Sequence, residues 1–239
     1  MINFDFDKIA VKCSEFGAEL TEDKKDKLTL YGNLLVEWNE KMNLTAITDP
    51  EGILYKHFYD CILFLKHIEI PENATLVDVG TGAGFPGMVL KIMREDLDVT
   101  LLDSLNKRLV FLNEVIEKLG LKGIKTVHSR AEDAGKNKAF REKFDIATAR
   151  AVANLPVLLE YCTPLVKKNG IFVSMKGPSA TEESEKCGNA IKILGLSEPN
   201  IIFEELPGND KRAFVSLKKI SQTPPKYPRK PSDISKQPL

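Results

Sequence analysis

From residue 75 onward, short apolar segments alternate with segments that have the spacing of amphipathic helices. A short apolar run between turn-forming residues is typical of a buried strand, and apolar residues three and four apart indicate a helix face. We predict strands at 76–79, 99–103, 124–127, 144–149, 171–175, 201–203 and 213–217, and helices at 88–94, 107–119, 155–166 and 181–194. Strands that alternate with helices form a parallel sheet that is covered on both faces.

The last two predicted strands have no helix between them. Only the turn-forming sequence Pro207-Gly208-Asn209-Asp210 separates residues 201–203 from residues 213–217. A tight turn joins antiparallel strands, whereas parallel neighbours need a long crossover. A sheet that ends in this way is the usual layout of class I methyltransferases. The sequence therefore predicts an α/β, Rossmann-like fold of this class, with a mostly parallel seven-stranded sheet, an antiparallel last strand and additional N-terminal helices.

The chain divides into three predicted parts: an N-terminal helical cap (1–72), the sheet domain (73–220) and a basic, proline-rich tail (221–239). In the cap, Leu28, Tyr31 and Leu35 recur at helical spacing. Asp49-Pro50 is typical of a helix start, with an N-cap followed by proline at the first position. The tail has five prolines in nineteen residues, and we expect it to be extended.

Charge is unevenly distributed, although the net charge is zero. Residues 1–70 hold eight lysines against thirteen acidic residues, and the last nineteen residues hold four basic residues and one acidic residue. This asymmetry weakly favours contact of a polyanion with the C-terminal part, and a solvated surface explains it almost as well.

The sequence argues against export, membrane insertion and metal binding. The acidic N-terminus lacks the basic and then apolar layout of a secretory signal. No apolar run approaches the roughly 20 residues of a membrane helix. The four cysteines and three histidines lack the spacing of metal ligands. We expect a cytoplasmic protein with reduced cysteines and no metal.

The glycine-rich segment at residues 78–87 fits two cofactor-binding templates. Gly82-Ala83-Gly84-Phe85-Pro86-Gly87 matches the G-x-G-x-x-G dinucleotide fingerprint, and Asp103 follows about twenty residues later, as that fingerprint requires. Asp78-Val79-Gly80-Thr81-Gly82-Ala83-Gly84 matches the D-x-G-x-G-x-G loop that binds S-adenosylmethionine. Glycines suit either ligand, because a Cβ would block the approach of ligand to backbone. They could also make only a tight turn.

The charge of Asp78 favours S-adenosylmethionine. A carboxylate at this loop would repel the pyrophosphate of a dinucleotide. S-adenosylmethionine has no phosphate, and its ammonium and sulfonium groups are cationic. Asp103 suits ribose hydroxyls in either case. We therefore predict Asp78, Gly80, Gly82, Gly84 and Asp103 as cofactor residues, with an NAD-dependent oxidoreductase as the alternative function.

A series of further blocks, taken with this loop, resembles the bacterial 16S rRNA (guanine-N7) methyltransferase family, known as RsmG or GidB. The resemblance runs from about residue 30 to the C-terminus. It departs from the family pattern mildly, at Cys61 and Ser232. The blocks are Asn43-Leu44-Thr45, His57-Phe58-Tyr59-Asp60, residues 78–87, Leu105-Asn106-Lys107-Arg108, Arg130-Ala131-Glu132-Asp133, Ala149-Arg150-Ala151-Val152-Ala153, Lys176-Gly177 and Tyr227-Pro228-Arg229-Lys230.

The resemblance implies roles for individual residues. Gly80 and Phe85 would line the path of the cofactor, and Ala131 and Glu132 would contact its adenine. Arg150 would position cofactor and substrate, which makes it the candidate catalytic residue. A guanidinium at the end of a strand is also costly unless it is paired.

The implied substrate is a guanine of 16S rRNA, within naked rRNA or the small ribosomal subunit. Guanine N7 carries a lone pair and no proton, so no general base is required. His57 is therefore more readily a packed core residue than a catalytic one, and Asn43 fits guanine recognition and turn capping equally well. We expect a monomer. The predicted RNA contacts are Lys107, Arg108, Lys125, Arg130, Lys226, Arg229 and Lys230.

Overall fold

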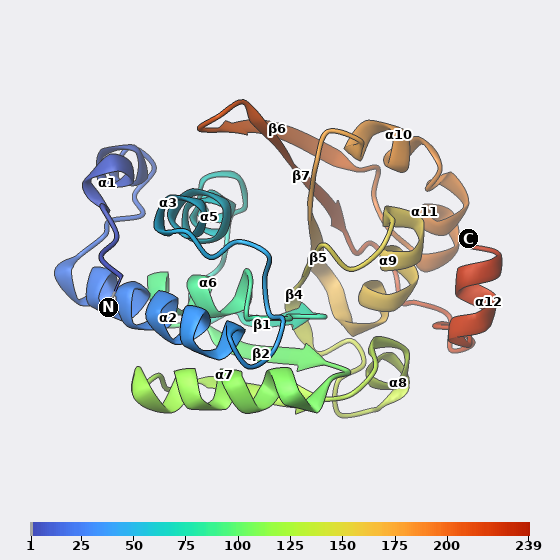
Figure 1. Cartoon of the computed structure of the whole chain (residues 1–239). Helices are drawn as coiled ribbons and strands as arrows, with labels where there is room; N and C mark the ends of the chain where they lie inside the picture. Colours follow the sequence, from blue (N-terminus) through green and yellow to red (C-terminus); the bar gives the residue numbers. More distant parts are fainter. Residues whose placement is uncertain (1) are drawn as a thin grey trace.

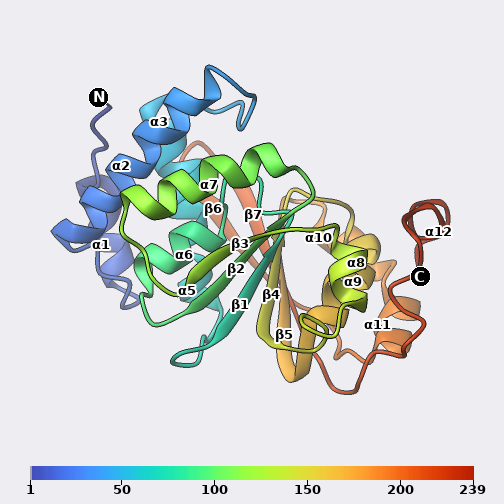
Figure 2. The ribbon, with the colours of Figure 1, turned by 90° about the horizontal axis from the view of Figure 1, so that it is seen from below.

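The chain forms a seven-stranded sheet with helices on both faces (Figures 1 and 2). The computed structural model describes residues 2–239. The first five strands pair in parallel, and β7 pairs antiparallel with both β5 and β6. The predicted fold class is confirmed. In spatial order the strands are β3 (Ile124–His128), β2 (Asp98–Asp103), β1 (Thr75–Val79), β4 (Phe144–Arg150), β5 (Val166–Lys176), β7 (Asp210–Lys218) and β6 (Asn200–Leu206).

Two hydrophobic cores lie on opposite faces of the sheet. One lies under α6 (Gly87–Met93), α7 (Asn106–Lys118) and the N-terminal helices, and the other under α9 (Leu155–Cys162) and α11 (Gly188–Leu194). Along β1, Leu76 belongs to the first core and Val77 to the second. This alternation follows from the two-residue period of a strand. Figure 1 shows the N-terminal helices to the left of the sheet and α9 to α12 to its right.

Two of the N-terminal helices begin at a capping side chain, and the start at Asp49-Pro50 was predicted. Thr21 caps α2 (Glu22–Asn39) by accepting a hydrogen bond from the Lys24 amide. Asp49 caps the next helix through the Gly52 amide at 2.7 Å. This helix is not regular, however, because it contains a π-helical stretch that the sequence pattern does not predict. Its parts are α3 (Pro50–Gly52), the π-helix η1 (Ile53–Tyr59), α4 (Asp60–Ile62) and α5 (Phe64–His67), and the short α1 (Asp7–Ser14) lies before α2.

The helices after β3 differ from the predicted boundaries. The predicted helix 181–194 is divided into α10 (Ala180–Glu185) and α11. The predicted helix 155–166 ends at Cys162, because Pro164 lacks an N–H and disfavours helix before it. The short α8 (Ala131–Lys136) was not predicted. Within residues 2–239, no helix combines the length and apolar character needed to cross a membrane.

The C-terminal tail is packed against the sheet domain, which corrects the prediction of an extended segment. Tyr227 and Ile234 are buried, and residues 231–236 form the helix α12 (Pro231–Lys236). The Arg141 guanidinium donates to the backbone carbonyls of Thr223 and Tyr227 at 2.7 and 2.8 Å. Satisfied backbone acceptors of this kind allow an irregular segment to lie in the interior.

Candidate active site

The glycine loop connects β1 to α6 in the way that its sequence predicts. Gly80, Gly82 and Gly84 have φ values of +68°, +60° and +102°, which disfavour residues with a side chain. The Asp78 side chain is fully buried beneath the loop. Its Oδ2 accepts hydrogen bonds from the Thr81 hydroxyl at 2.7 Å and the Gly87 amide at 2.9 Å. Asp78 therefore fixes both ends of the loop.

The second oxygen of Asp78 has no hydrogen-bond partner among the described residues, 2–239. A buried acceptor without a partner costs free energy, so this atom is suited to a donor from a ligand. Burial also raises the pKa of the Asp78 carboxyl to about 6.

We predict that Asp78→Asn stabilises the ligand-free protein at pH 8 but not at pH 4. A carboxyl whose folded-state pKa is raised contributes stability below its unfolded-state pKa of 3.8, and this is lost as pH rises through about 6. The ionised carboxylate then costs about 3 kcal/mol, which a neutral amide avoids. Unfolding free energies across pH 4–8 test this, with the exposed Asp98→Asn as control. An equal effect of Asp78→Asn at both pH values would contradict the prediction.

Asp103, at the end of β2, also contacts the glycine loop. Its Oδ2 accepts from the Gly82 amide at 2.9 Å and its Oδ1 from the Leu105 amide at 2.8 Å. The Arg108 guanidinium lies 3.3 Å from Oδ2. Arg108 is therefore paired with Asp103, the residue predicted to bind the ribose, and this weakens the prediction that Arg108 contacts RNA.

The predicted adenine residues line a cavity beside the glycine loop, which we call the loop pocket. Ala131 and Glu132 begin α8, and the cavity has a volume of about 230 Å³. The Val152 side chain packs against the loop at Gly80: a Cβ on Gly80 would lie 2.7 Å from Cγ2 of Val152. The residues that line the loop pocket are Val79, Gly80, Leu102, Ser104, Ser129, Arg130, Ala131, Glu132, Val152, Tyr161 and Pro231.

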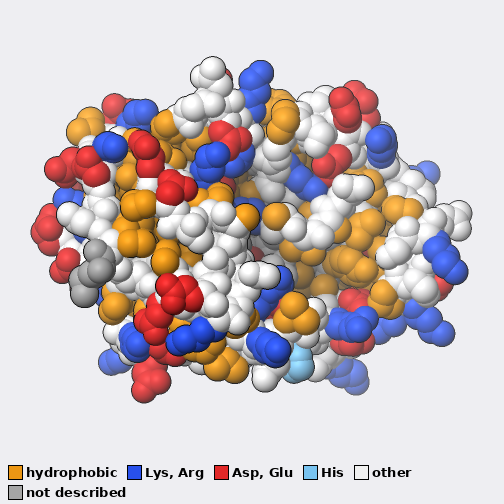
Figure 3. Space-filling model, viewed as in Figure 1, with side chains coloured by type: hydrophobic (Ala, Val, Ile, Leu, Met, Phe, Trp, Pro, Cys, Tyr) orange, Lys and Arg blue, Asp and Glu red, His pale blue; other side chains and the backbone are white. Residues whose placement is uncertain are grey.

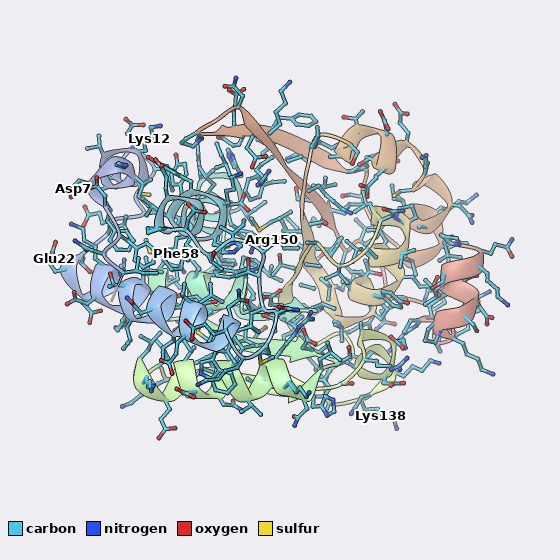
Figure 4. The ribbon with its side chains drawn as sticks, in the orientation of Figure 1. Asp7, Lys12, Glu22, Phe58, Lys138 and Arg150 are labelled. Carbon is cyan, nitrogen blue, oxygen red and sulfur yellow. The ribbon has the colours of Figure 1, made fainter. Side chains whose placement is uncertain are left out.

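Arg150, at the end of β4, is held from several directions. It lies between the sheet and the helical layer that carries Phe58 (Figure 4). Its Nη1 donates to Asp60 Oδ2 and to the Lys56 carbonyl, both at 3.1 Å. Its guanidinium carbon lies 4.8 Å from the ring centroid of Phe85. Arg150 and Phe85, which were predicted from different sequence blocks, are therefore in contact.

His57 is neutral in this arrangement. Its ring stacks on Phe85 with the centroids 4.4 Å apart. Nδ1 lies 3.3 Å from Arg150 Nη2 and 3.1 Å from the Lys56 carbonyl, and Nε2 lies 2.8 Å from Thr45 Oγ1. Burial and the Arg150 charge lower the pKa of His57 to about 3. The residue is packed and orients Arg150, and its protonation state does not change near neutral pH.

Sequence reasoning missed two charged residues at this site. Asp60 is 2% exposed and lies between two guanidiniums, 3.1 Å from Arg150 and 3.4 Å from Arg212. Burial raises the pKa of Asp60, and both arginines oppose that shift. Asp60 is an acidic residue on the apolar face of the helix at 53–65, and that unusual position is the sequence signal that could have identified it. Arg212, on β7, had no local signal.

These residues line a second cavity of about 350 Å³, which we call the arginine pocket. Four cationic side chains line it, and carboxylates partly neutralise them: Asp60 pairs with Arg150 and Arg212, Asp210 with Arg212 and Lys56, and Glu183 with Lys176. Ala151 lines the arginine pocket and Val152 lines the loop pocket, so the two cavities lie on either side of one short segment. Figure 3 shows basic side chains beside a central hollow, and acidic ones gathered over the N-terminal helices.

The predicted RNA-contact residues differ in exposure and in whether another residue already pairs with them. Lys107, Arg130, Lys226 and Lys230 are exposed. Lys125 is exposed as well, but it pairs with Thr100 near the amino end of its strand, away from the edge that carries the pockets. The Arg229 guanidinium is occupied by the fully buried Glu160, at 2.7 Å between Nη2 and Oε2.

Comparison with solved structures supports the fold. A SAM dependent methyltransferase from Aquifex aeolicus superposes with a TM-score of 0.53, at 21% identity, over 77% of this chain and 98% of that chain. A predicted O-methyltransferase from Agrobacterium tumefaciens superposes with a TM-score of 0.54, at 19% identity, over 69% of this chain and 82% of that chain. At these identities the likeness concerns the fold alone.

Sequence relatives are much closer. The ribosomal RNA small subunit methyltransferase G of Clostridium perfringens (strain 13 / Type A) is 54% identical over 98% of both chains. The protein of the same name from Desulforamulus reducens is 51% identical over 97% of this chain and 96% of its own. The family model described as rRNA small subunit methyltransferase G matches residues 24–210. The chain therefore belongs to the rRNA small subunit methyltransferase G (GidB) family.

Proposed function

We propose that this protein transfers a methyl group from S-adenosylmethionine to N7 of a guanine in 16S rRNA. The observation that carries the proposal is the pair of cavities that flank residues 150–152. One cavity lies against a glycine loop, and the other is lined by cations. A methyl donor and a polyanionic acceptor would meet between them.

The residues present fit S-adenosylmethionine. The left-handed glycines leave room beside the loop, and the partnerless oxygen of Asp78 is suited to a cationic or N–H group. Asp103 accepts from three groups, and a carboxylate has about four acceptor sites, so one remains for a ribose hydroxyl. Membership of a methyltransferase family favours this cofactor over NAD, the alternative cofactor. When bound, it supplies a methyl group on a positively charged sulfur.

The arginine pocket suits an RNA nucleotide. Its two partly buried guanidiniums favour phosphate and base oxygens, and Asp60 limits the repulsion between Arg150 and Arg212. The target guanine would have to leave the RNA stack to reach this depth. Exposed lysines around the opening, such as Lys107 and Lys230, would hold the flanking backbone.

Residues of the chain then act by orientation. Guanine N7 has no proton to lose, which agrees with a neutral His57 whose pKa is about 3. Holding donor and acceptor in line can lower the barrier by roughly 7–11 kcal/mol. Arg150, fixed by Asp60, the Lys56 carbonyl and Phe85, is rigid enough to set that orientation.

The experiment that tests this proposal is transfer of a tritiated methyl group to 16S rRNA, followed by chain cleavage specific for N7-methylguanine. Naked rRNA and the small ribosomal subunit are assayed separately, because either could be the substrate. We expect cleavage at one guanine. Methylation of a different atom would overturn the N7 assignment, and absence of transfer to both substrates would overturn the proposal as a whole.

A further inference from the structure

The C-terminal segment, residues 221–239, reaches the loop pocket although it is distant from the glycine loop in sequence. Pro231, the first residue of α12, lines that cavity together with Tyr161 of α9 and Ala131 of α8. In Figure 1, α12 lies at the right of the molecule, beside α9. The segment therefore contributes surface to the pocket that the sequence pattern assigned to the glycine loop and to residues 131–132.

We infer that the C-terminal segment forms a wall of the loop pocket and that its docking sets the affinity for the adenosine part of the cofactor. The inference rests on the proposed function, because adenosine is the group that the loop pocket would hold. A proline ring presents a rigid apolar face, which suits the face of a purine.

A buried ion pair anchors the segment on α9. Glu160 is fully buried and accepts hydrogen bonds from three donor groups of one residue of the tail. The donors are the Arg229 amide at 2.7 Å, its Nε at 2.9 Å and its Nη2 at 2.7 Å. Removing either partner of such a buried pair is costly, so Arg229 and Glu160 fix the position of the tail on α9.

A second anchor holds the same segment to α8. A Cβ on Gly135 would lie 3.1 Å from the Pro228 ring, so that ring packs closely against the α8 backbone. Arg141 Nη1 donates to the carbonyls of Gly135 and Tyr227, both at 2.8 Å. The segment is thus attached to α8 and α9, and α8 begins with the two predicted adenine residues. Pro231 follows these anchors by only two residues, so its position is set by them.

This arrangement assigns Arg229 a structural role. The sequence analysis predicted Arg229 as an RNA contact. With its guanidinium on Glu160 and a further bond from Nη2 to the Gln237 carbonyl at 3.0 Å, Arg229 also holds the end of α12. Loss of the tail should therefore weaken binding of the cofactor.

The test is calorimetric titration of the full-length protein with S-adenosylhomocysteine and, separately, with adenosine. In Pro231→Ala, which removes the ring but retains a good helix former, we expect Kd for both ligands to rise about fivefold. Deletion of residues 231–239 retains the Arg229–Glu160 pair and should raise both Kd values about tenfold or more. Pro225→Ala, at an exposed proline of the same tail, is the matched control and should match the wild type.

The outcomes separate this inference from the proposed function. Wild-type affinity in both Pro231→Ala and the deletion variant would contradict the inference that the C-terminal segment forms a wall of the loop pocket. It would leave the proposed cofactor unchanged. Failure of the wild-type protein to bind S-adenosylhomocysteine would overturn the cofactor assignment and the inference with it. Melting temperatures measured without ligand accompany the titrations. Weaker binding by Pro231→Ala at an unchanged melting temperature supports a direct contact.

Discussion

Gly80→Asp is expected to weaken binding of S-adenosylhomocysteine by about 100-fold or more. Gly80 has a φ of +68°, and an added Cβ would lie 2.7 Å from Cγ2 of Val152. Val152 is part of the loop-pocket wall, so the new side chain can only displace that wall or enter the cavity. Its carboxylate would also stand near the buried charge of Asp78. Calorimetric titration of the purified variant measures the effect.

Gly120→Asp provides the matched control for this substitution. Gly120 has a φ of +61°, so the variant carries similar left-handed backbone strain, of about 1–2 kcal/mol. Nothing lies within 4 Å of an added Cβ at Gly120. We expect this control to lose some stability and to bind ligand like the wild type. If Gly80→Asp bound as well as Gly120→Asp did, the loop would not be the cofactor site.

Asp60→Asn is expected to reduce the rate of methyl transfer at saturating substrate by about 100-fold. The carboxylate is the shared counter-ion of Arg150 and Arg212, at 3.1 and 3.4 Å. Without its charge, the two neighbouring guanidiniums repel each other, and only the Lys56 carbonyl, His57 and the Phe85 ring remain to position Arg150. Removing one partner of a buried ion pair also costs about 3–5 kcal/mol of stability. Single-turnover transfer to rRNA, measured with unfolding free energies, tests both effects.

Asp210→Asn distinguishes positioning from loss of stability. Asp210 also pairs with Arg212, at 2.9 Å between Oδ2 and Nη2, but it is partly exposed and does not touch Arg150. We expect the rate of methyl transfer by Asp210→Asn to stay within about threefold of the wild-type rate, because an exposed ion pair contributes little. In Asp60→Asn, the affinity for S-adenosylhomocysteine should change far less than the rate of methyl transfer. A normal rate of methyl transfer in Asp60→Asn would exclude a positioning role for Asp60.

Sequence alone predicted the features that depend on local pattern. The strands could be located because apolar runs are interrupted by turns, and the glycine loop because only glycine adopts its backbone freely. The N-cap Asp49 was predicted because a cap satisfies amides only two or three residues away. The antiparallel end of the sheet followed from the length of a single connection.

Features that depend on distant contacts were not predicted. Arg150 and Asp60 are ninety positions apart, and Arg212 is farther still from Asp60, so no window of sequence contains the cluster. An isolated basic residue reads as a surface charge unless its partner is known. Arg229 was therefore assigned to RNA, although the fold pairs it with Glu160, 69 positions away. Arg108 lies only five positions from its partner Asp103, but the sequence does not show which way either side chain points.

Tyr31 of α2 is fully buried, and its hydroxyl donates to the Ala83 carbonyl within the glycine loop. A Cβ on Gly84 would also lie 2.6 Å from that hydroxyl. The N-terminal helices therefore supply part of the loop's own support, and they share a core with one face of the sheet. As a consequence, the segment 73–220 is not an exchangeable module. A chimera that joins it to a foreign N-terminal domain would have to reproduce a phenol at this position before the loop could take its shape.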